Sequence, residues 1–107
     1  MSPNELPLSC VGFDWDKENL SKNWEKHGVG FWECEEIFFN QPLLLSDDIR
    51  HSQEEERVYA LGKTDAQRPL YLAFTLRHRK IRVISARDMS RKERSEYRNA
   101  EKKDSNF

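Results

Sequence analysis

The first half of the chain carries its apolar residues at helical spacing. One stripe, with positions i, i+4 and i+7, consists of Leu20, Trp24 and His27. Asp16 stands where a helix N-cap belongs, and Gly28 stands where helices commonly end in left-handed geometry. These signals predict a first helix over residues 17–27.

A second helical stripe follows Gly30. Its members recur at i, i+3, i+6 and i+7 and are Phe31, Cys34, Ile37 and Phe38. Pro42 disfavours helical geometry at Gln41. We therefore predict a second helix over residues 31–39, which ends before this proline.

The remaining apolar residues alternate with polar ones, which is the period of a half-buried strand. The clearest case runs from Leu70 to Arg77, where leucines and Phe74 occupy every second position. Strands are predicted over residues 11–15, 43–46, 55–62, 70–77 and 81–87. The last two are joined by Arg77-His78-Arg79-Lys80, which must turn tightly without a glycine.

Ser90 and Glu93 have the spacing of a capping box, in which each side chain binds the backbone N–H of the other residue. A last helix is therefore predicted over residues 91–102, with Tyr97 and Ala100 as its core contacts. The order of elements indicates an α+β fold, with two N-terminal helices packed on a mostly antiparallel sheet and one C-terminal helix. Besides Trp15, the residues expected to pack against the sheet are Leu20, Trp24, Phe31, Ile37 and Phe38.

A chain of 107 residues has the length of one domain. Residues 1–10 contain two prolines and no periodicity. We interpret them as a loose leader, residues 11–103 as the domain and residues 104–107 as a tail. No run approaches the roughly 18 apolar residues of a membrane span, and the N-terminus lacks the pattern of a secretory signal. We expect a cytoplasmic protein without membrane contact, with Cys10 and Cys34 as reduced thiols.

The net charge of −1 hides a strong asymmetry. Residues 1–76 carry 7 Lys or Arg and 14 Asp or Glu, whereas residues 77–103 carry 11 and 4. The C-terminal quarter is therefore expected to meet an anion. That anion is a nucleic-acid backbone, an acidic partner protein or the acidic half of the chain itself.

No motif for a phosphate-binding loop, a zinc protease or a CxxC metal pair occurs, and the three histidines lack ligand spacing. We therefore predict neither a metal nor a cofactor. The chemistry-bearing residues that remain are arginines on predicted strands, namely Arg57, Arg77, Arg82 and Arg87. They form either a solvated sheet face or a cluster of guanidinium groups that binds phosphate. Strict alternation puts Arg82 and Arg87 on opposite faces unless a β-bulge intervenes, so we expect one of them to fall outside the cluster.

Other candidate residues each have a structural alternative. Glu55 is either a general base or half of a surface ion pair. Lys26 and His27 either contact a substrate or stabilise the C-terminal end of the first helix. His51 titrates near neutrality but lies in a predicted loop. Tyr97 is either a core residue or a proton donor.

Short motifs follow one another along residues 11–98. They are FDWD at Phe13–Asp16, N-x-x-K-H-G-V at Asn23–Val29, the helix Phe31–Phe39, Asp48, His51-Ser52, E-x-R at Glu55–Arg57, Leu61-Gly62, F-T-x-R at Phe74–Arg77, I-R-V-I-S-A-R at Ile81–Arg87, Glu93 and Tyr97. In this order they resemble the BrnT family of bacterial type II toxins. The chain departs from the family pattern at His78 and Glu54, where family members often carry glycine.

The resemblance implies a RelE-like α+β fold and an endoribonuclease activity that needs no metal. It also implies a cognate BrnA-type antitoxin with a ribbon-helix-helix DNA-binding part, so that the toxin contacts DNA only through the antitoxin. The clustered basic residues of the family correspond here to Lys26, Arg57, Arg77, Arg82 and Arg87.

We interpret the chain as a toxin that cleaves RNA and arrests growth. The residues expected to be catalytic are Glu55, as the base, and Arg57, Arg77 and Arg82, as cations on the phosphorane. The residues expected to contact RNA are Lys26, His27, His51, Arg87 and Tyr97. The alternative is a non-catalytic module that binds RNA or an acidic protein and acts as a co-regulator with the antitoxin.

Overall fold

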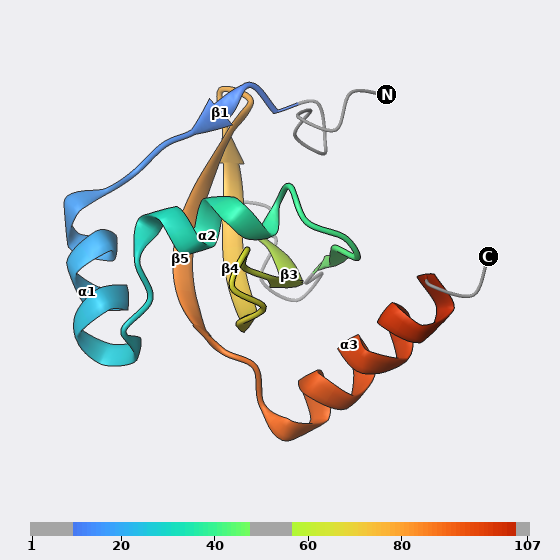
Figure 1. The fold of residues 1–107 in the computed structure, drawn as a ribbon. Coiled ribbons are helices and arrows are strands. Elements are labelled where there is room, and N and C mark those ends of the chain that lie inside the picture. Colours follow the sequence, from blue (N-terminus) through green and yellow to red (C-terminus); the bar gives the residue numbers. More distant parts are fainter. Residues whose placement is uncertain (1–9, 48–56, 105–107) are drawn as a thin grey trace.

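The computed structural model describes residues 10–47 and 57–104, which form three helices and one five-stranded sheet (Figure 1). In chain order the elements are β1 (Gly12–Phe13), α1 (Lys17–His27), α2 (Phe31–Ile37), β2 (Leu44–Asp47), β3 (Arg57–Lys63), β4 (Pro69–Arg77), β5 (Lys80–Asp88) and α3 (Arg91–Asp104). The strand order is β1-β5-β4-β3-β2, antiparallel from β2 to β5, with β1 parallel to β5. The predicted α+β fold, with a mostly antiparallel sheet, is confirmed.

Helix α1 begins and ends where the sequence predicted. The side chain of Asp16 accepts a hydrogen bond from the backbone N–H of Glu18 at 2.9 Å, which satisfies one of the free donors at the helix start. Gly28 has a φ of 61° and donates back to the last turn, a conformation that glycine adopts without strain. Helix α2 is shorter than predicted because Phe38 and Phe39 donate to carbonyls only three residues back.

Strands β4 and β5 are joined through His78 and Arg79. Both residues have positive φ values, 51° and 62°. A two-residue hairpin turn needs this left-handed conformation to match the twist of its strands, and Asn or Gly usually supplies it. The tight turn predicted without a glycine is therefore present, with two ordinary side chains in left-handed positions.

One irregularity in the pairing of β4 with β5 decides which way the arginines point. The register pairs on either side of it are Phe74–Val83 and Ala73–Ser85, which makes Ile84 an extra residue in β5. A bulge of this kind shifts the alternation of side chains by one position. Arg82, opposite Thr75, and Arg87, opposite Tyr71, therefore lie on the same face. The expectation that alternation puts Arg82 and Arg87 on opposite faces is therefore wrong.

Helix α2 lies on the other face of the sheet, where the core sits, and α1 lies beside β5 (Figure 1). Core residues include Ile37, Phe38, Val58, Leu70, Leu72, Phe74, Ile81 and Val83. The rings of Phe38 and Phe74 pack edge to face with centroids 5.2 Å apart. Gly62 permits the close approach of α2, because a Cβ atom there would lie 2.9 Å from Cβ of Ile37.

Two aromatic residues predicted in the core lie largely outside it. Trp24 is 56% exposed and Phe31 is 48% exposed, and Leu20 is half-buried. Trp15 does pack against the core, as predicted. The helical stripe therefore identified α1 correctly but assigned its buried side wrongly.

The physical reason is that α1 covers the edge of β5 with side-chain amides. Asn19 donates to the carbonyl of Val83 at 3.2 Å, and Asn23 accepts from the N–H of Ala86 at 3.1 Å. Backbone groups at a covered sheet edge need such partners. Because the amide side of α1 faces β5, Trp24 points away from the core.

Helix α3 begins with the predicted capping box. The N–H of Ser90 donates to Oε1 of Glu93 at 2.8 Å, and the N–H of Glu93 donates to Oγ of Ser90 at 3.2 Å. The helix then packs beside β3, where Glu101 pairs with Lys63 at 3.1 Å. Tyr97 anchors it, being 3% exposed and donating its hydroxyl to the carbonyl of Pro42 at 2.6 Å.

Candidate functional site

The candidate site is the sheet face opposite α2, which we call the arginine face because it carries Arg57, Arg77, Arg82 and Arg87. Arg57 lies opposite Thr75, and Thr75 lies opposite Arg82. Because neighbouring strands lie about 4.8 Å apart, the backbones of Arg57 and Arg82 are about 10 Å apart. Arg77 follows Thr75 by two positions and is exposed, as is Arg57. The three arginines predicted to bind phosphate therefore start from neighbouring positions on one face.

Arg82 is held by two carboxylates from the segment before α1. Its Nη2 lies 2.7 Å from Oδ2 of Asp16, and its Nη1 lies 3.4 Å from Oδ2 of Asp14. Its side chain is 24% exposed. A phosphate that approaches Arg82 therefore meets a guanidinium group whose charge is already balanced by acids.

Arg87 is held by a bidentate ion pair and by a contact with an aromatic ring. Its two terminal nitrogens lie 2.8 and 3.1 Å from the two carboxylate oxygens of Glu93, and its guanidinium carbon lies 3.9 Å above the ring of Tyr71. The hydrogen bond from Arg87 lowers the pKa of Glu93. Tyr71 in turn stacks on Tyr59, with ring centroids 5.7 Å apart.

A groove of about 330 Å³ runs beside these stacked rings, between the sheet and α3. It is lined by Leu44, Leu45, Ser46, Tyr59, Leu61, Tyr71, Glu93 and Glu96. The groove combines aromatic and aliphatic walls with a rim of two carboxylates. It extends the arginine face away from Arg57 and Arg82.

The other predicted site residues are not all brought to this face. Lys26 and His27 end α1, near Asp88, at the opposite end of β5 from Arg82. Tyr97 lies on the buried side of α3 and is 3% exposed, so an RNA contact would need the helix to move. Glu55 and His51 lie outside the described residues.

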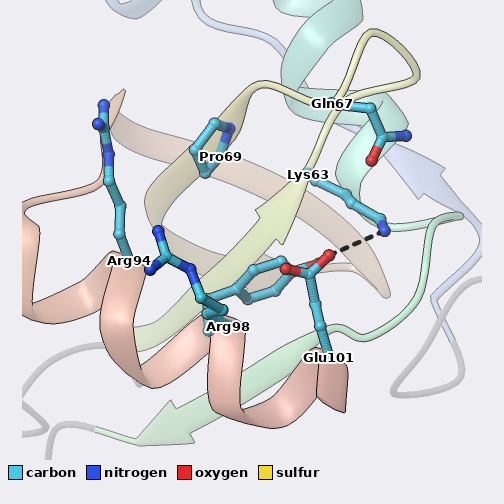
Figure 2. Close-up of a pocket in the computed structure, with 7 residues that line it drawn as sticks. Lys63, Gln67, Pro69, Arg94, Arg98 and Glu101 are labelled. Carbon is cyan, nitrogen blue, oxygen red and sulfur yellow. Dashed lines mark hydrogen bonds and ion pairs between the residues drawn. The ribbon is translucent and has the colours of Figure 1, made fainter. Parts of the chain in front are cut away.

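A second hollow, of about 280 Å³, lies on the other side of α3 (Figure 2). Its lining residues are Lys63, Gln67, Pro69, Arg94, Tyr97, Arg98 and Glu101. Lys63 and Glu101 form an ion pair at 3.1 Å across it. Arg94 and Arg98 add two cations from successive turns of α3, so this hollow has a positive balance.

The family of the chain follows from comparison with known proteins. The family model described as "Ribonuclease toxin, BrnT, of type II toxin-antitoxin system" matches residues 15–93. The chain belongs to the BrnT family. Its fold is similar to the crystal structure of the Brucella abortus ribonuclease toxin BrnT, with a TM-score of 0.53, 21% identity, and coverage of 76% of this chain and 99% of that chain. A comparison with curated proteins gives no match.

Membership in the BrnT family confirms the resemblance and places the chain among ribonuclease toxins that have an antitoxin partner. Two of the quoted BrnT motifs have structural roles here. In FDWD, Asp16 caps α1 through one oxygen and binds Arg82 through the other. In N-x-x-K-H-G-V, Asn23 binds the backbone of β5 and Gly28 ends α1.

Arg68 is an extensively bonded residue that the sequence analysis missed. It donates to both carboxylate oxygens of Asp88, to both carboxylate oxygens of Glu33, and to the carbonyls of His27 and Gly28. These bonds lower the pKa of Asp88 and raise that of Arg68. Arg68 precedes a proline in a loop, where no periodicity marks it. Its role is to join α1, α2 and β5.

No group of three or more His, Cys, Asp or Glu is placed to hold a metal ion within residues 10–47 and 57–104. Over the same residues, no helix combines the length and apolar character of a membrane crossing. Cys10 and Cys34 are not joined in a disulfide. Burial, followed by the neighbouring Glu33 and Glu35, raises the pKa of Cys34 to about 12, so this thiol stays protonated and is a poor nucleophile.

Proposed function

We propose that this chain is an endoribonuclease that cleaves RNA without a metal ion and arrests growth when its antitoxin is absent. The observation that carries the proposal is the shared face of Arg57, Arg77 and Arg82, in a chain whose family is described as ribonuclease toxins. Guanidinium groups from adjacent strands suit one phosphodiester, and they stabilise the added negative charge of a phosphorane.

In the proposed reaction the RNA 2′-hydroxyl gives its proton to Glu55 and attacks the adjacent phosphorus. The bond to the 5′-oxygen breaks, and that oxygen takes a proton from an acid, which leaves a 2′,3′-cyclic phosphate and a 5′-hydroxyl. His27, His51 and Tyr97 are the side chains that we consider as this acid. His27 sits at the far end of β5 and Tyr97 donates to Pro42, so we favour His51.

We further propose that RNA extends along the arginine face from Arg57, Arg77 and Arg82 past Arg87. In this proposal Lys26, His27 and Tyr97 are at most peripheral to the bound RNA. The partner is proposed to be a BrnA-type antitoxin with a ribbon-helix-helix DNA-binding part. In this proposal the toxin works in the cytoplasm and reaches DNA only through the antitoxin.

The test is to incubate the purified chain with a defined RNA in excess EDTA and to analyse the product ends. We expect cleavage that survives the chelator and 2′,3′-cyclic phosphate ends. Arg57→Gln and Arg77→Gln should each lower kcat by about 100-fold or more, the usual effect of removing one group that stabilises transition-state charge. Arg91→Gln, an exposed change on α3, is the matched control. RNA that stays intact with the wild-type chain contradicts the proposal.

One observation favours the alternative function. Arg82 and Arg87 are already paired with carboxylates, as expected for arginines that hold a fold together rather than a substrate. The alternative is a non-catalytic module that binds RNA or an acidic protein and acts as a co-regulator with its antitoxin. RNA that is retained on a filter but never cleaved would support it.

A further inference from the structure

The helical layer exposes a connected group of aromatic rings, which we call the aromatic cluster: Trp15, Trp24, Phe31 and Trp32. Trp24, Phe31 and Trp32 are 56%, 48% and 49% exposed. Trp32 touches both neighbours, with ring centroids 6.0 Å from Trp24 and 5.5 Å from Phe31. Phe31 continues to the half-buried Trp15 at 6.1 Å. Contiguous exposed aromatic surface is uncommon on a monomer and marks an interaction site.

The rings of the cluster are held in place before any partner arrives. A Cβ atom at Gly30 would lie 2.4 Å from the ring of Trp32. The indole can therefore pack against this position only because the residue is glycine. Nε1 of Trp15 donates to Oε2 of Glu35 at 2.8 Å. Because a rigid aromatic side chain loses little entropy on binding, such rings make strong interface anchors.

The charge around the cluster selects the kind of partner. Residues 14–36, which span α1 and α2, carry seven Asp or Glu and three Lys. Arg82 pairs with Asp14 and Asp16, and Arg68 pairs with Glu33. With these two arginines included, the net charge is still negative, at −2. Proteins that stack single-stranded nucleic acid on aromatic rings surround those rings with positive charge. A phosphate backbone is therefore repelled here, whereas a protein segment with apolar side chains and Lys or Arg beside them is attracted.

We propose that the aromatic cluster is the docking site of the antitoxin, occupied by an amphipathic segment whose apolar side chains cover Trp24 and Trp32 and whose Lys or Arg side chains meet the surrounding carboxylates. The proposal rests on the toxin–antitoxin part of the proposed function. Helix α2, which carries Phe31 and Trp32, lies on the sheet face opposite the arginine face, and α1, which carries Trp24, lies beside the edge of β5. Antitoxin docking at the cluster therefore anchors the complex without itself occupying the residues proposed for catalysis.

The chain supplies its own reporter, because its three tryptophans all belong to the cluster. The cognate antitoxin, with any tryptophan of its own replaced by Phe, is titrated into the full-length toxin. We expect the emission to shift to shorter wavelength and acrylamide quenching to fall as the indoles leave water. Formation of the complex with unchanged emission and quenching overturns the proposal.

Variants locate the contact. Trp24→Ala and Trp32→Ala should each weaken antitoxin binding by about 30-fold or more, as for central aromatic anchors, while Gly30→Ala should weaken it by displacing the ring of Trp32. The matched control is Leu45→Ala, which removes an apolar side chain, 37% exposed, on β2. Thermal melts confirm folding. Wild-type affinity in both folded tryptophan variants overturns the proposal.

Further measurements distinguish the antitoxin from other occupants of the aromatic cluster. They also separate a failure of this proposal from a failure of the ribonuclease proposal. Sedimentation of the free toxin as a dimer that Trp32→Ala dissociates would assign the cluster to a second copy of the chain. A change of tryptophan emission with an RNA whose 2′-hydroxyls are methylated, and which therefore cannot be cleaved, would assign it to RNA. RNA cleavage by Trp24→Ala and Trp32→Ala should stay at the wild-type rate. If the wild-type chain does not cleave RNA, the ribonuclease proposal is contradicted, but the result of the antitoxin titration is unaffected.

Discussion

The carboxylate of Asp16 joins helix α1 to Arg82 of strand β5. Its Oδ1 accepts the N–H of Glu18 at 2.9 Å, and its Oδ2 accepts Nη2 of Arg82 at 2.7 Å. One side chain therefore caps the helix and orients an arginine proposed to bind phosphate. The two roles can be separated by substitution, because asparagine caps helices nearly as well as aspartate but carries no charge.

We expect Asp16→Ala to lower the free energy of unfolding by about 1–2 kcal/mol, the typical cost of a lost N-cap. Asp16→Asn should cost about 1 kcal/mol or less, since it removes only a partly exposed ion pair. Urea denaturation of both variants measures the difference. Equal losses would show that the cap contributes nothing measurable.

Phe74 lies fully buried at the centre of the core, where it packs against Phe38. Phe74→Ala should lower the free energy of unfolding by about 3–5 kcal/mol, through lost burial and the cavity that remains. Phe39→Ala is the matched control, since this ring is 42% exposed and should cost about 1 kcal/mol or less. A melting curve unchanged by Phe74→Ala would contradict the described core.

Arg68 joins three elements through a fork of donors that lysine does not have. Arg68→Lys keeps the charge but not the simultaneous bonds to Asp88, Glu33 and the end of α1. We expect it to cost about 2–3 kcal/mol, the range for hydrogen bonds to charged groups. Arg94→Lys, an exposed change on α3, is the control. Equal stability of the two variants would show that charge alone accounts for the role of Arg68.

The stability of the fold should fall in acid. Arg87 holds the pKa of Glu93 below its ordinary 4.5, and Arg68 holds that of Asp88 below its ordinary 3.8. A carboxylate with a lowered folded pKa contributes stability above its unfolded pKa and loses that contribution as the pH falls through the folded value. Denaturation curves should therefore show a decline that begins at about pH 4.5 and continues below it.

Glu93→Gln tests the origin of this decline, because glutamine keeps the capping box but removes the charge. We expect the variant to be less stable at neutral pH and to have a flatter pH profile. Asp88 contributes less, since its side chain is 49% exposed and its ion pair is screened by water. A Glu93→Gln profile parallel to that of the wild type would assign the decline to other carboxylates.

The turn between β4 and β5 should gain stability from glycine. Arg79 has a φ of 62°, which costs an ordinary residue about 1–2 kcal/mol. The greater freedom of glycine in the unfolded chain offsets part of this, so Arg79→Gly should stabilise the fold by about 0.5–1 kcal/mol. Lys80→Gly, one position into β5, should destabilise it. Denaturant midpoints compare the two, and a loss in both would show that Arg79 contributes more by its side chain than its backbone conformation costs.

Helix caps and hydrophobic periodicity were enough to predict the elements that depend on neighbours along the chain. The bounds of α1 follow from Asp16, Gly28 and the intervening stripe, and the capping box at Ser90 marks the start of α3. The alternation from Leu70 to Arg77 identified β4 and its buried face. These signals are local, because caps and periodicity act within a few residues.

The tertiary structure alone decided the relationships between distant segments. The bulge at Ile84 gathered the arginines on one face, although strict alternation separates Arg82 from Arg87. The amide contacts of α1 with β5 left Trp24 exposed. Arg68 forms hydrogen bonds with three elements that are far from it in sequence. Edge coverage, register shifts and ion pairs depend on which backbone lies alongside which, and no local pattern in a single chain contains that information.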